Sequence, residues 1–184
     1  MDLLDRKFAV CFAHLDDDGS GAAERVDIDR IADRMLAAFP AAGQTEQAAY
    51  RDGLYRFWSA IVAECDADAD GRVTRPEYIR GMRAVAADPS KIAAGFHAMG
   101  EATVRLLDVD GDGRIAPAEF AASVEVLGVR PDDAAETFAL LDRDGDGHIT
   151  VSELGTAIAE YYTSADPQAP GNYLFGRSFE RVAA

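Results

Sequence analysis

The chain has 184 residues, of which 48% are hydrophobic, so it can bury a core without disulfides or a structural metal. Its formal net charge is −15, and the location of this charge matters, because an evenly acidic surface would favour a basic partner. No apolar run approaches the roughly 20 residues of a membrane span, which argues against a membrane helix, and the first residues lack the pattern of a secretory leader, which favours the cytoplasm.

Four short acidic segments each lie between two stretches in which apolar residues recur at helical spacing. The segments begin at residues 16, 66, 108 and 142. A helical period on both sides of a polar loop predicts a helix–loop–helix unit. The chain is therefore predicted to be a fourfold repeat of such units, with an all-α fold.

A break with the sequence Asp-Pro-Ser at 88–90 divides the four units into two pairs. We expect residues 1–88 to form an N-terminal pair and residues 89–184 to form a C-terminal pair. The first two acidic segments start 50 residues apart, so the helices between them must be long. Long helices would bring the two pairs together in one compact domain.

Each acidic segment has the spacing of a twelve-residue Ca²⁺ loop. Ca²⁺ takes six to eight oxygen ligands, and such a loop supplies them from positions 1, 3, 5, 7, 9 and 12, with glycine at position 6 for the sharp turn. Position 7 contributes its backbone carbonyl, and an acidic side chain at position 12 closes the ligand sphere. The predicted loops are 16–27, 66–77, 108–119 and 142–153.

The first loop departs from this pattern. Ser20 offers a neutral oxygen at position 5, Ala23 is small at position 8, and Asp27 at position 12 is one methylene shorter than glutamate. We predict that Asp27 coordinates through one oxygen, which leaves a six-fold geometry that suits Mg²⁺ better than Ca²⁺. The predicted ligands of loop 1 are Asp16, Asp18, Ser20, the carbonyl of Ala22, Glu24 and Asp27.

The other three loops match Asp-x-Asp-x-Asp-Gly with glutamate at position 12, which is a specific signature when apolar helices flank it. The predicted ligands of loop 2 are Asp66, Asp68, Asp70, the carbonyl of Arg72, and Glu77. Those of loop 3 are Asp108, Asp110, Asp112, the carbonyl of Arg114, and Glu119. Those of loop 4 are Asp142, Asp144, Asp146, the carbonyl of His148, and Glu153. The chain is thus predicted to bind up to four Ca²⁺ ions.

The loops also account for the net charge. Fifteen of the 33 acidic residues occupy positions 1, 3, 5 and 12 of the four loops, and the other 18 are balanced by 18 lysines and arginines. The remaining surface therefore has no excess charge for a basic partner, and we expect no binding to nucleic acid or to a membrane. Ile115 and Ile149, each at position 8, should pair and couple loops 3 and 4.

An aromatic cluster follows a Pro/Gly-rich segment in the tail, 166–184. We predict that Tyr173, Leu174 and Phe175 dock this tail on the folded body, because a solvated tail rarely carries such side chains together. Trp58 is interpreted as a core aromatic residue and the three histidines as surface or loop residues. The two cysteines fit buried, reduced thiols.

These features make the chain similar to EF-hand proteins of the sarcoplasmic calcium-binding protein group and its bacterial relative calerythrin. The resemblance rests on four unequally spaced units and on the Pro-Gly-Asn-Tyr-Leu-Phe-Gly segment at 170–176. It implies a compact helical fold in which two EF-hand pairs face each other, and a cytosolic role in Ca²⁺ buffering or transport. In that group one hand, often the second, has lost ligands, whereas loop 2 is complete here, so a silent second site is not expected.

The favoured function is that of a Ca²⁺ (or Ca²⁺/Mg²⁺) buffer, and two alternatives stay open. A sensor that regulates a protein partner needs a flexible Met-rich groove, and this chain has four scattered methionines. A small-molecule carrier of the photoprotein type would share the compact shape around an apolar cavity. We find no Ser/His/Asp, Cys/His or cofactor signature of an enzyme and nothing that identifies a protein partner, and we expect a monomer.

Overall fold

The computed structural model describes residues 1–182, apart from the side chains of residues 89, 92–95 and 132, so the last two residues of the tail lie outside the description. The elements in chain order are α1 (Leu3–Leu15), β1 (Ala22–Ala23), α2 (Arg25–Ala38), α3 (Gln44–Cys65), β2 (Val73–Thr74), α4 (Arg75–Ala87), α5 (Pro89–Leu107), α6 (Pro117–Val126), α7 (Pro131–Leu141), α8 (Val151–Thr163), and the 3₁₀-helices η1 (Pro170–Tyr173) and η2 (Ser178–Arg181). The predicted all-α EF-hand fold is confirmed. Within the described residues, every helix is too short or too polar to cross a bilayer.

The helix boundaries follow the loop positions. Each leading helix ends one residue before position 1, and each trailing helix begins at position 10. The trailing helices start there because the position-12 carboxylate accepts the backbone N–H of position 9, as Glu119 does from Ala116 at 2.8 Å. This contact is half of a capping box, in which a side chain in the first turn satisfies an unpaired helix N–H. A predicted metal ligand therefore also caps its helix.

Short antiparallel contacts join the loops in pairs. β1 and β2 pair with Ala23 opposite Val73, which joins loops 1 and 2. Ile115 and Ile149 exchange two backbone hydrogen bonds of 2.9 Å, which joins loops 3 and 4 as predicted. The side chains of these four residues are fully buried. Each loop is thus fixed to its partner at position 8.

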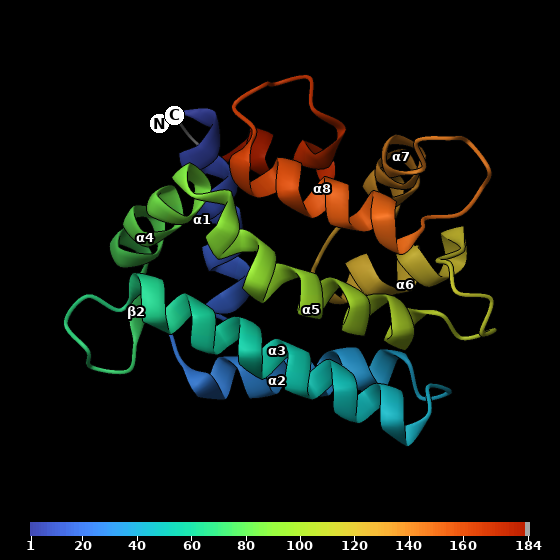
Figure 1. Ribbon diagram of the computed structural model, residues 1–184, viewed down its shortest axis with the longest axis horizontal. Coiled ribbons are helices and arrows are strands. Elements are labelled where there is room, and N and C mark those ends of the chain that lie inside the picture. Colours follow the sequence, from blue (N-terminus) through green and yellow to red (C-terminus); the bar gives the residue numbers. More distant parts are fainter. Residues whose placement is uncertain (183–184) are drawn as a thin grey trace.

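One continuous core connects the two EF-hand pairs. The long helix α3 packs along α5, and α8 packs on the other side of α5 (Figure 1). Aromatic contacts cross this junction, since the ring of Phe96 lies 5.1 Å from that of Phe57 and 4.4 Å from that of Tyr162. Trp58 lies in the same core, as expected, and Cys11 and Cys65 are buried free thiols. The apolar faces of the two pairs therefore cover each other.

The C-terminal tail is docked on the body, as predicted. Leu174 is buried in the core, and the ring of Phe175 packs against Tyr161 at 5.1 Å. The contacts of Tyr173 differ from those of Leu174 and Phe175, although its helix η1 packs on α7 and α8. Its half-buried ring packs on Phe179 at 5.6 Å, within the tail itself. Tyr173 therefore braces the tail, and Leu174 and Phe175 attach it.

Candidate functional site

Three of the four loops bring their predicted side-chain ligands together. In each of them, one oxygen from each of three acidic residues lies within 4.8 Å of the others. One ion can contact three oxygens at this separation, because Ca²⁺–oxygen distances are about 2.3 to 2.6 Å. The groups are Asp66, Asp68 and Asp70 in loop 2; Asp108, Asp110 and Glu119 in loop 3; and Asp142, Asp144 and Glu153 in loop 4.

In these three loops the glutamate at position 12 spans the loop. Glu119 Oε1 accepts a hydrogen bond from the N–H of Val109 at position 2, and Oε2 accepts one from Ala116 at position 9, both at 2.8 Å. Glu77 and Glu153 make the same two contacts in their own loops at 2.8 to 3.2 Å. The carboxylate is therefore held at both ends, and in loops 3 and 4 it belongs to the group of three, whereas Glu77 of loop 2 does not.

The aspartate at position 1 fixes the turn of every loop. Asp108 Oδ2 accepts the N–H of Gly113 at 2.8 Å, and Gly113 has a φ of +81°. Glycine adopts this conformation without strain because it has no Cβ. Loops 2 and 4 have the same bond at 3.0 and 2.9 Å, and in loop 1 Asp16 accepts from Gly21 at 3.0 Å. The turn is thus intact in all four loops.

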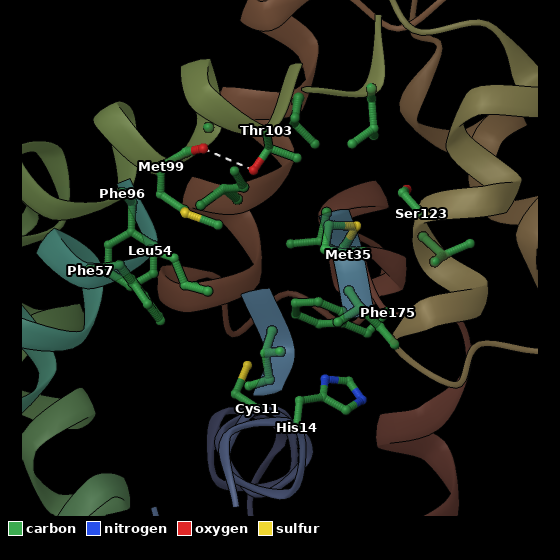
Figure 2. A pocket seen from close by; sticks show the side chains of 18 of the residues that line it. Cys11, His14, Met35, Leu54, Phe57, Phe96, Met99, Thr103, Ser123 and Phe175 are labelled. Carbon is green, nitrogen blue, oxygen red and sulfur yellow. Dashed lines mark hydrogen bonds between the residues drawn. The ribbon is translucent and has the colours of Figure 1, made fainter. Parts of the chain in front are cut away.

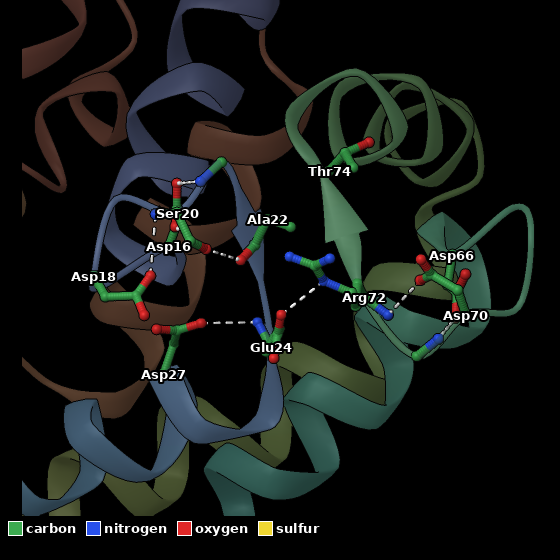
Figure 3. Close-up of polar contacts among 12 residues, drawn as sticks. Asp16, Asp18, Ser20, Ala22, Glu24, Asp27, Asp66, Asp70, Arg72 and Thr74 are labelled. Atoms are coloured by element: carbon green, nitrogen blue, oxygen red, sulfur yellow. Dashed lines mark hydrogen bonds and ion pairs between the residues drawn. The ribbon is translucent and has the colours of Figure 1, made fainter.

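Residues at positions 5 and 7 have roles that the sequence did not predict. Asp112 and Asp146 are not in the groups of three, and each accepts the N–H of position 7 in its own loop, at 2.8 and 2.9 Å. The side chains at position 7 join paired loops, since Arg114 Nη1 lies 3.0 Å from Asp146 Oδ2. Likewise, Arg72 Nε lies 2.6 Å from Glu24 Oε1 (Figure 3). The sequence did contain a signal for these ion pairs, namely an arginine at position 7 of one loop and an acidic residue in the loop that pairs with it.

The donor sets of loops 2 to 4 fit Ca²⁺. They consist of carboxylate and carbonyl oxygens, the ligands that this hard cation prefers. The carboxylates in the groups of three are exposed or half-buried, so an ion can reach them from solvent. Several like charges in one loop repel each other, so binding a cation relieves this repulsion and stabilises the fold.

Loop 1 is arranged differently. In the described structure its carboxylates do not form such a group of three. Asp27 Oδ2 accepts the N–H of Glu24 at 2.9 Å, but Asp27 Oδ1 lies 3.0 Å from Nη1 of Arg30 (Figure 3 shows Asp27 and Glu24). Burial raises the pKa of Asp27. The Ser20 hydroxyl donates a hydrogen bond of 3.0 Å to the carbonyl oxygen of Ala22, so two predicted ligands are hydrogen-bonded to each other.

An apolar cavity of about 190 Å³ lies between the two EF-hand pairs (Figure 2). Every unit contributes to its lining, and the tail contributes Leu174 and Phe175. Ile115, which pairs loops 3 and 4, also lines it. The two pairs thus cover each other's apolar faces without filling all the space between them.

His14 faces this cavity, so its interpretation as a surface or loop residue is wrong. Its ring packs edge-on against Phe175 at 4.9 Å (Figure 2). Its Nδ1 atom is buried and has no hydrogen-bond partner among the described residues. Burial lowers the pKa of His14 to about 4, so the imidazole is neutral near pH 7. His97 and His148 lie on an exposed helix surface and in loop 4, as expected.

Comparisons with known proteins agree with this geometry. A family model described as EF hand matches residues 101–124 and 134–158. A calcium-binding protein from Streptomyces coelicolor is 32% identical, and the match covers 87% of this chain and 98% of that protein, with a TM-score of 0.79. No curated protein matches the chain.

Two more distant structures share the fold. The amphioxus sarcoplasmic calcium-binding protein is 18% identical over 96% of this chain and 97% of its own, with a TM-score of 0.76. Calcium-loaded apo-aequorin from Aequorea victoria is 20% identical over 88% and 91%, with a TM-score of 0.73. At these identities the likeness concerns the fold alone.

Proposed function

The chain belongs to the EF-hand calcium-binding proteins, and from this premise we propose that it is a cytoplasmic Ca²⁺ buffer. It holds the ion and releases it by mass action, without catalysing a reaction. Loops 2 to 4 supply the main Ca²⁺ sites, and loop 1 supplies a fourth site that also accepts Mg²⁺. The protein acts as a monomer.

The observation that carries this proposal is the mutual burial of the apolar faces of the two EF-hand pairs. A Ca²⁺ sensor opens a hydrophobic groove for its partner, whereas a buffer hardly opens. Here α3, α5 and α8 pack together, and the tail packs against α1, α7 and α8. The exposed large hydrophobic side chains among the described residues are Met1, Val26, Val109 and Val151. They belong to the N-terminus and to three different loops, and single exposed side chains of this kind are ordinary on a folded surface.

Calcium titration in the presence of Mg²⁺, followed by calorimetry and by an apolar-surface dye, tests the buffer role. We expect Ca²⁺ to bind and raise the urea midpoint while dye fluorescence stays low. The variants Glu119→Gln and Glu153→Gln should each weaken one site, because the amide carries no charge and has one oxygen fewer. The fold should persist in both variants.

The same experiment detects a regulatory role. The Streptomyces coelicolor relative is described as acting in calcium-mediated regulation. A large rise in dye fluorescence on adding Ca²⁺, together with Ca²⁺-dependent capture of a protein partner, would replace the buffer role by a sensor role.

The cavity supports a second candidate function, the carriage of a small apolar molecule. A dry apolar cavity of about 150 Å³ holds benzene in another protein, and this cavity measures about 190 Å³. The buried, unpartnered Nδ1 of His14 offers one hydrogen bond to such a ligand.

Naphthalene is a suitable probe for the cavity. We expect it to raise the melting temperature of the Ca²⁺-loaded chain. Ser123→Leu should abolish this effect because Ser123 lines the cavity, whereas Ser152→Leu on the exposed side of α8 should preserve it. Equal responses of the wild type and Ser123→Leu would exclude the cavity as the binding site.

A further inference from the structure

Loop 1 differs from the other loops in how its position-12 carboxylate is held. In loops 2 to 4, the glutamate reaches the N–H of position 2 at 2.8 to 3.2 Å. Asp27 is one methylene shorter, and its second oxygen lies 3.0 Å from Nη1 of Arg30 in the next turn of α2. An arginine side chain thus makes the contact that a backbone N–H makes in the other loops.

Arg30 contacts two predicted metal ligands with the same nitrogen. Its Nη1 atom also lies 3.1 Å from Oδ2 of Asp18, the position-3 ligand. A divalent cation bound by Asp18 and Asp27 would use the same two oxygens and would be repelled by the guanidinium a few ångströms away. Arg30 is 44% exposed, so its side chain can move into solvent. The arginine and the metal ion therefore compete for one site.

Other arginines complete the neutralisation of this loop. Arg34 Nη1 lies 2.5 Å from Asp17 Oδ1, and Arg72 Nε lies 2.6 Å from Glu24 Oε1. Four of the five acidic residues of loop 1 are thus in ion pairs with arginine. Among the acidic residues of loops 2 to 4 that the structure describes, Asp146 alone has such a pair. In loop 1, arginine side chains of the same chain therefore neutralise most of the negative charge.

We propose that Arg30 is a built-in competitor of the metal ion at loop 1, so that a divalent cation binds there only by displacing the guanidinium from Asp18 and Asp27. This inference rests on the proposed function, because it concerns one of its four sites. Its consequence is an order of filling, in which loops 2 to 4 take up Ca²⁺ first and loop 1 takes it up last.

Calorimetric Ca²⁺ titration of the full chain tests the competition, with Arg30→Gln as the variant. Glutamine removes the charge and the guanidinium and keeps a shorter, polar side chain. We expect the weakest Ca²⁺ step to tighten by roughly 5- to 20-fold, which corresponds to the loss of one charge-assisted hydrogen-bond pair. The steps assigned to loops 2 to 4 should not change.

Arg80 provides a matched control. It follows Glu77 of loop 2 by three residues, as Arg30 follows Asp27, but in the described structure it forms no ion pair with a ligand of its loop. Arg80→Gln removes the same charge from the same register of α4. It should change each Ca²⁺ step by less than about twofold, because exposed charges that are not in contact interact weakly.

Urea unfolding distinguishes an Arg30 that competes with the metal ion from an Arg30 that only stabilises the fold. With a chelator present, Arg30→Gln should lower the midpoint, since Asp27 is 1% exposed and loses its cation. In saturating Ca²⁺ the variant should match or exceed the wild type, because the ion replaces the arginine. A structural role would lower the midpoint in both conditions.

The outcomes distinguish this inference from the function on which it rests. If loops 2 to 4 bind Ca²⁺ and Arg30→Gln either leaves the weakest step unchanged or tightens all steps equally, then Arg30 is not a competitor. If the wild-type chain binds no Ca²⁺ at any loop, the buffer function itself fails.

Discussion

The residue at position 12 is aspartate in loop 1 and glutamate in the other loops, and this difference of one methylene changes how the loop is held. The glutamates of loops 2 to 4 span from position 2 to position 9, whereas Asp27 reaches position 9 and Arg30. A carboxylate that bonds an arginine through one oxygen has to exchange that partner before it can offer the oxygen to an ion. The shorter side chain and its arginine thus both weaken Ca²⁺ binding at loop 1.

The variant Asp27→Glu should restore the spanning contact. We expect tighter Ca²⁺ binding at the weakest step, by about tenfold, and weaker competition by Mg²⁺, because a bidentate glutamate supplies the seventh oxygen that Ca²⁺ uses and octahedral Mg²⁺ does not. Calorimetry with and without Mg²⁺ measures both changes. Glu77→Gln in the complete neighbouring loop is the control and should instead remove a strong step. An unchanged weakest step with unchanged Mg²⁺ sensitivity would refute the role assigned to Asp27.

The sequence spacing predicted carboxylates that come together in loops 2 to 4, but it did not predict what compensates the charge of loop 1. Regular spacing identifies Asp18 and Asp27 because the loop geometry requires oxygens at fixed positions. Arg30 lies outside the twelve-residue loop, and an arginine in a helix is ordinarily a solvated surface residue. Arg80 shows the difficulty, since the same residue in the same register forms no such ion pair in the described part of the chain.

Among the helices, the crossing of α3 and α5 depends on a glycine. A Cβ on Gly53 would lie 3.0 Å from the Cβ of Ala102 and 3.6 Å from the carbonyl oxygen of Ala98. That contact is closer than packed carbon atoms tolerate without adjustment. Gly53 lies in a stretch whose apolar periodicity predicted the helix, but periodicity does not show how closely a second helix approaches.

The variant Gly53→Val should therefore destabilise the protein by about 1 to 3 kcal/mol, the usual range for overpacking a core. Gly155→Val is the matched control, because Gly155 is a helical glycine of α8 with no atom within 4 Å of its added Cβ. There the substitution should be neutral or stabilising, since valine has a better helix propensity than glycine. Urea unfolding of both variants in saturating Ca²⁺ gives the comparison. Equal effects at the two positions would show that the α3–α5 crossing is not tight.

Lys7 joins three elements at the C-terminal end of α8. Its fully buried amine donates to the carbonyl oxygens of Glu160 at 3.2 Å and Ser164 at 2.7 Å, and to Oδ1 of Asn172 in η1 at 2.9 Å. Three donors thus meet three acceptors. The positive charge also suits the negative end of the α8 dipole.

The variant Lys7→Met should lower the free energy of unfolding by about 2 to 4 kcal/mol, because the half-buried carbonyl of Ser164 and the buried amide oxygen of Asn172 lose their donor. The other lysine of the chain, Lys91, is the control. It forms a half-exposed ion pair with Glu64, so Lys91→Met should cost less than about 1 kcal/mol. Losses of the same size in the two variants would contradict the role of Lys7.

The pH dependence of stability provides a separate test of Lys7. Burial lowers the pKa of this amine from 10.5 to about 8. Between these values the unfolded chain holds the proton and the folded chain has released it, so the unfolded state binds more protons and stability from this group rises with pH. The wild type should therefore gain stability relative to Lys7→Met between about pH 8 and pH 10. A constant difference over this range would show that the pKa is not lowered.

For the whole molecule, the sequence predicted the compact body but not the cavity inside it. Apolar residues at helical spacing show which face of each helix turns inward, and the docked tail follows from its aromatic cluster. Whether the space between the two pairs is filled depends on how residues from many elements meet, and no local pattern contains that information. The inward position of His14 is part of the same result, because the sequence placed it only near the start of loop 1.

Removal of the tail should destabilise the whole body. A chain truncated after Ser164 loses Leu174 and Phe175, which pack on the core, and Asn172, which accepts from Lys7. Each large apolar side chain contributes about 1.5 to 3 kcal/mol when fully buried, before ordering costs. We therefore expect a fall of several kcal/mol in the free energy of unfolding, measured by urea unfolding in saturating Ca²⁺. A truncated chain with the stability of the full chain would mean that the tail is not docked.

Point variants within the tail distinguish residues that attach the tail to the body from residues that pack within the tail. Phe175 packs against Tyr161 and His14 in the body, whereas Tyr173 packs on Phe179 within the tail. Phe175→Ala should therefore lower the free energy of unfolding by about 2 kcal/mol or more, and Tyr173→Ala by less than half as much. Because Phe175 also lines the cavity, Phe175→Ala should enlarge it and change naphthalene binding, whereas Tyr173→Ala should not. Equal losses would mean that the tail docks as one rigid unit, in which bracing matters as much as contact with the body.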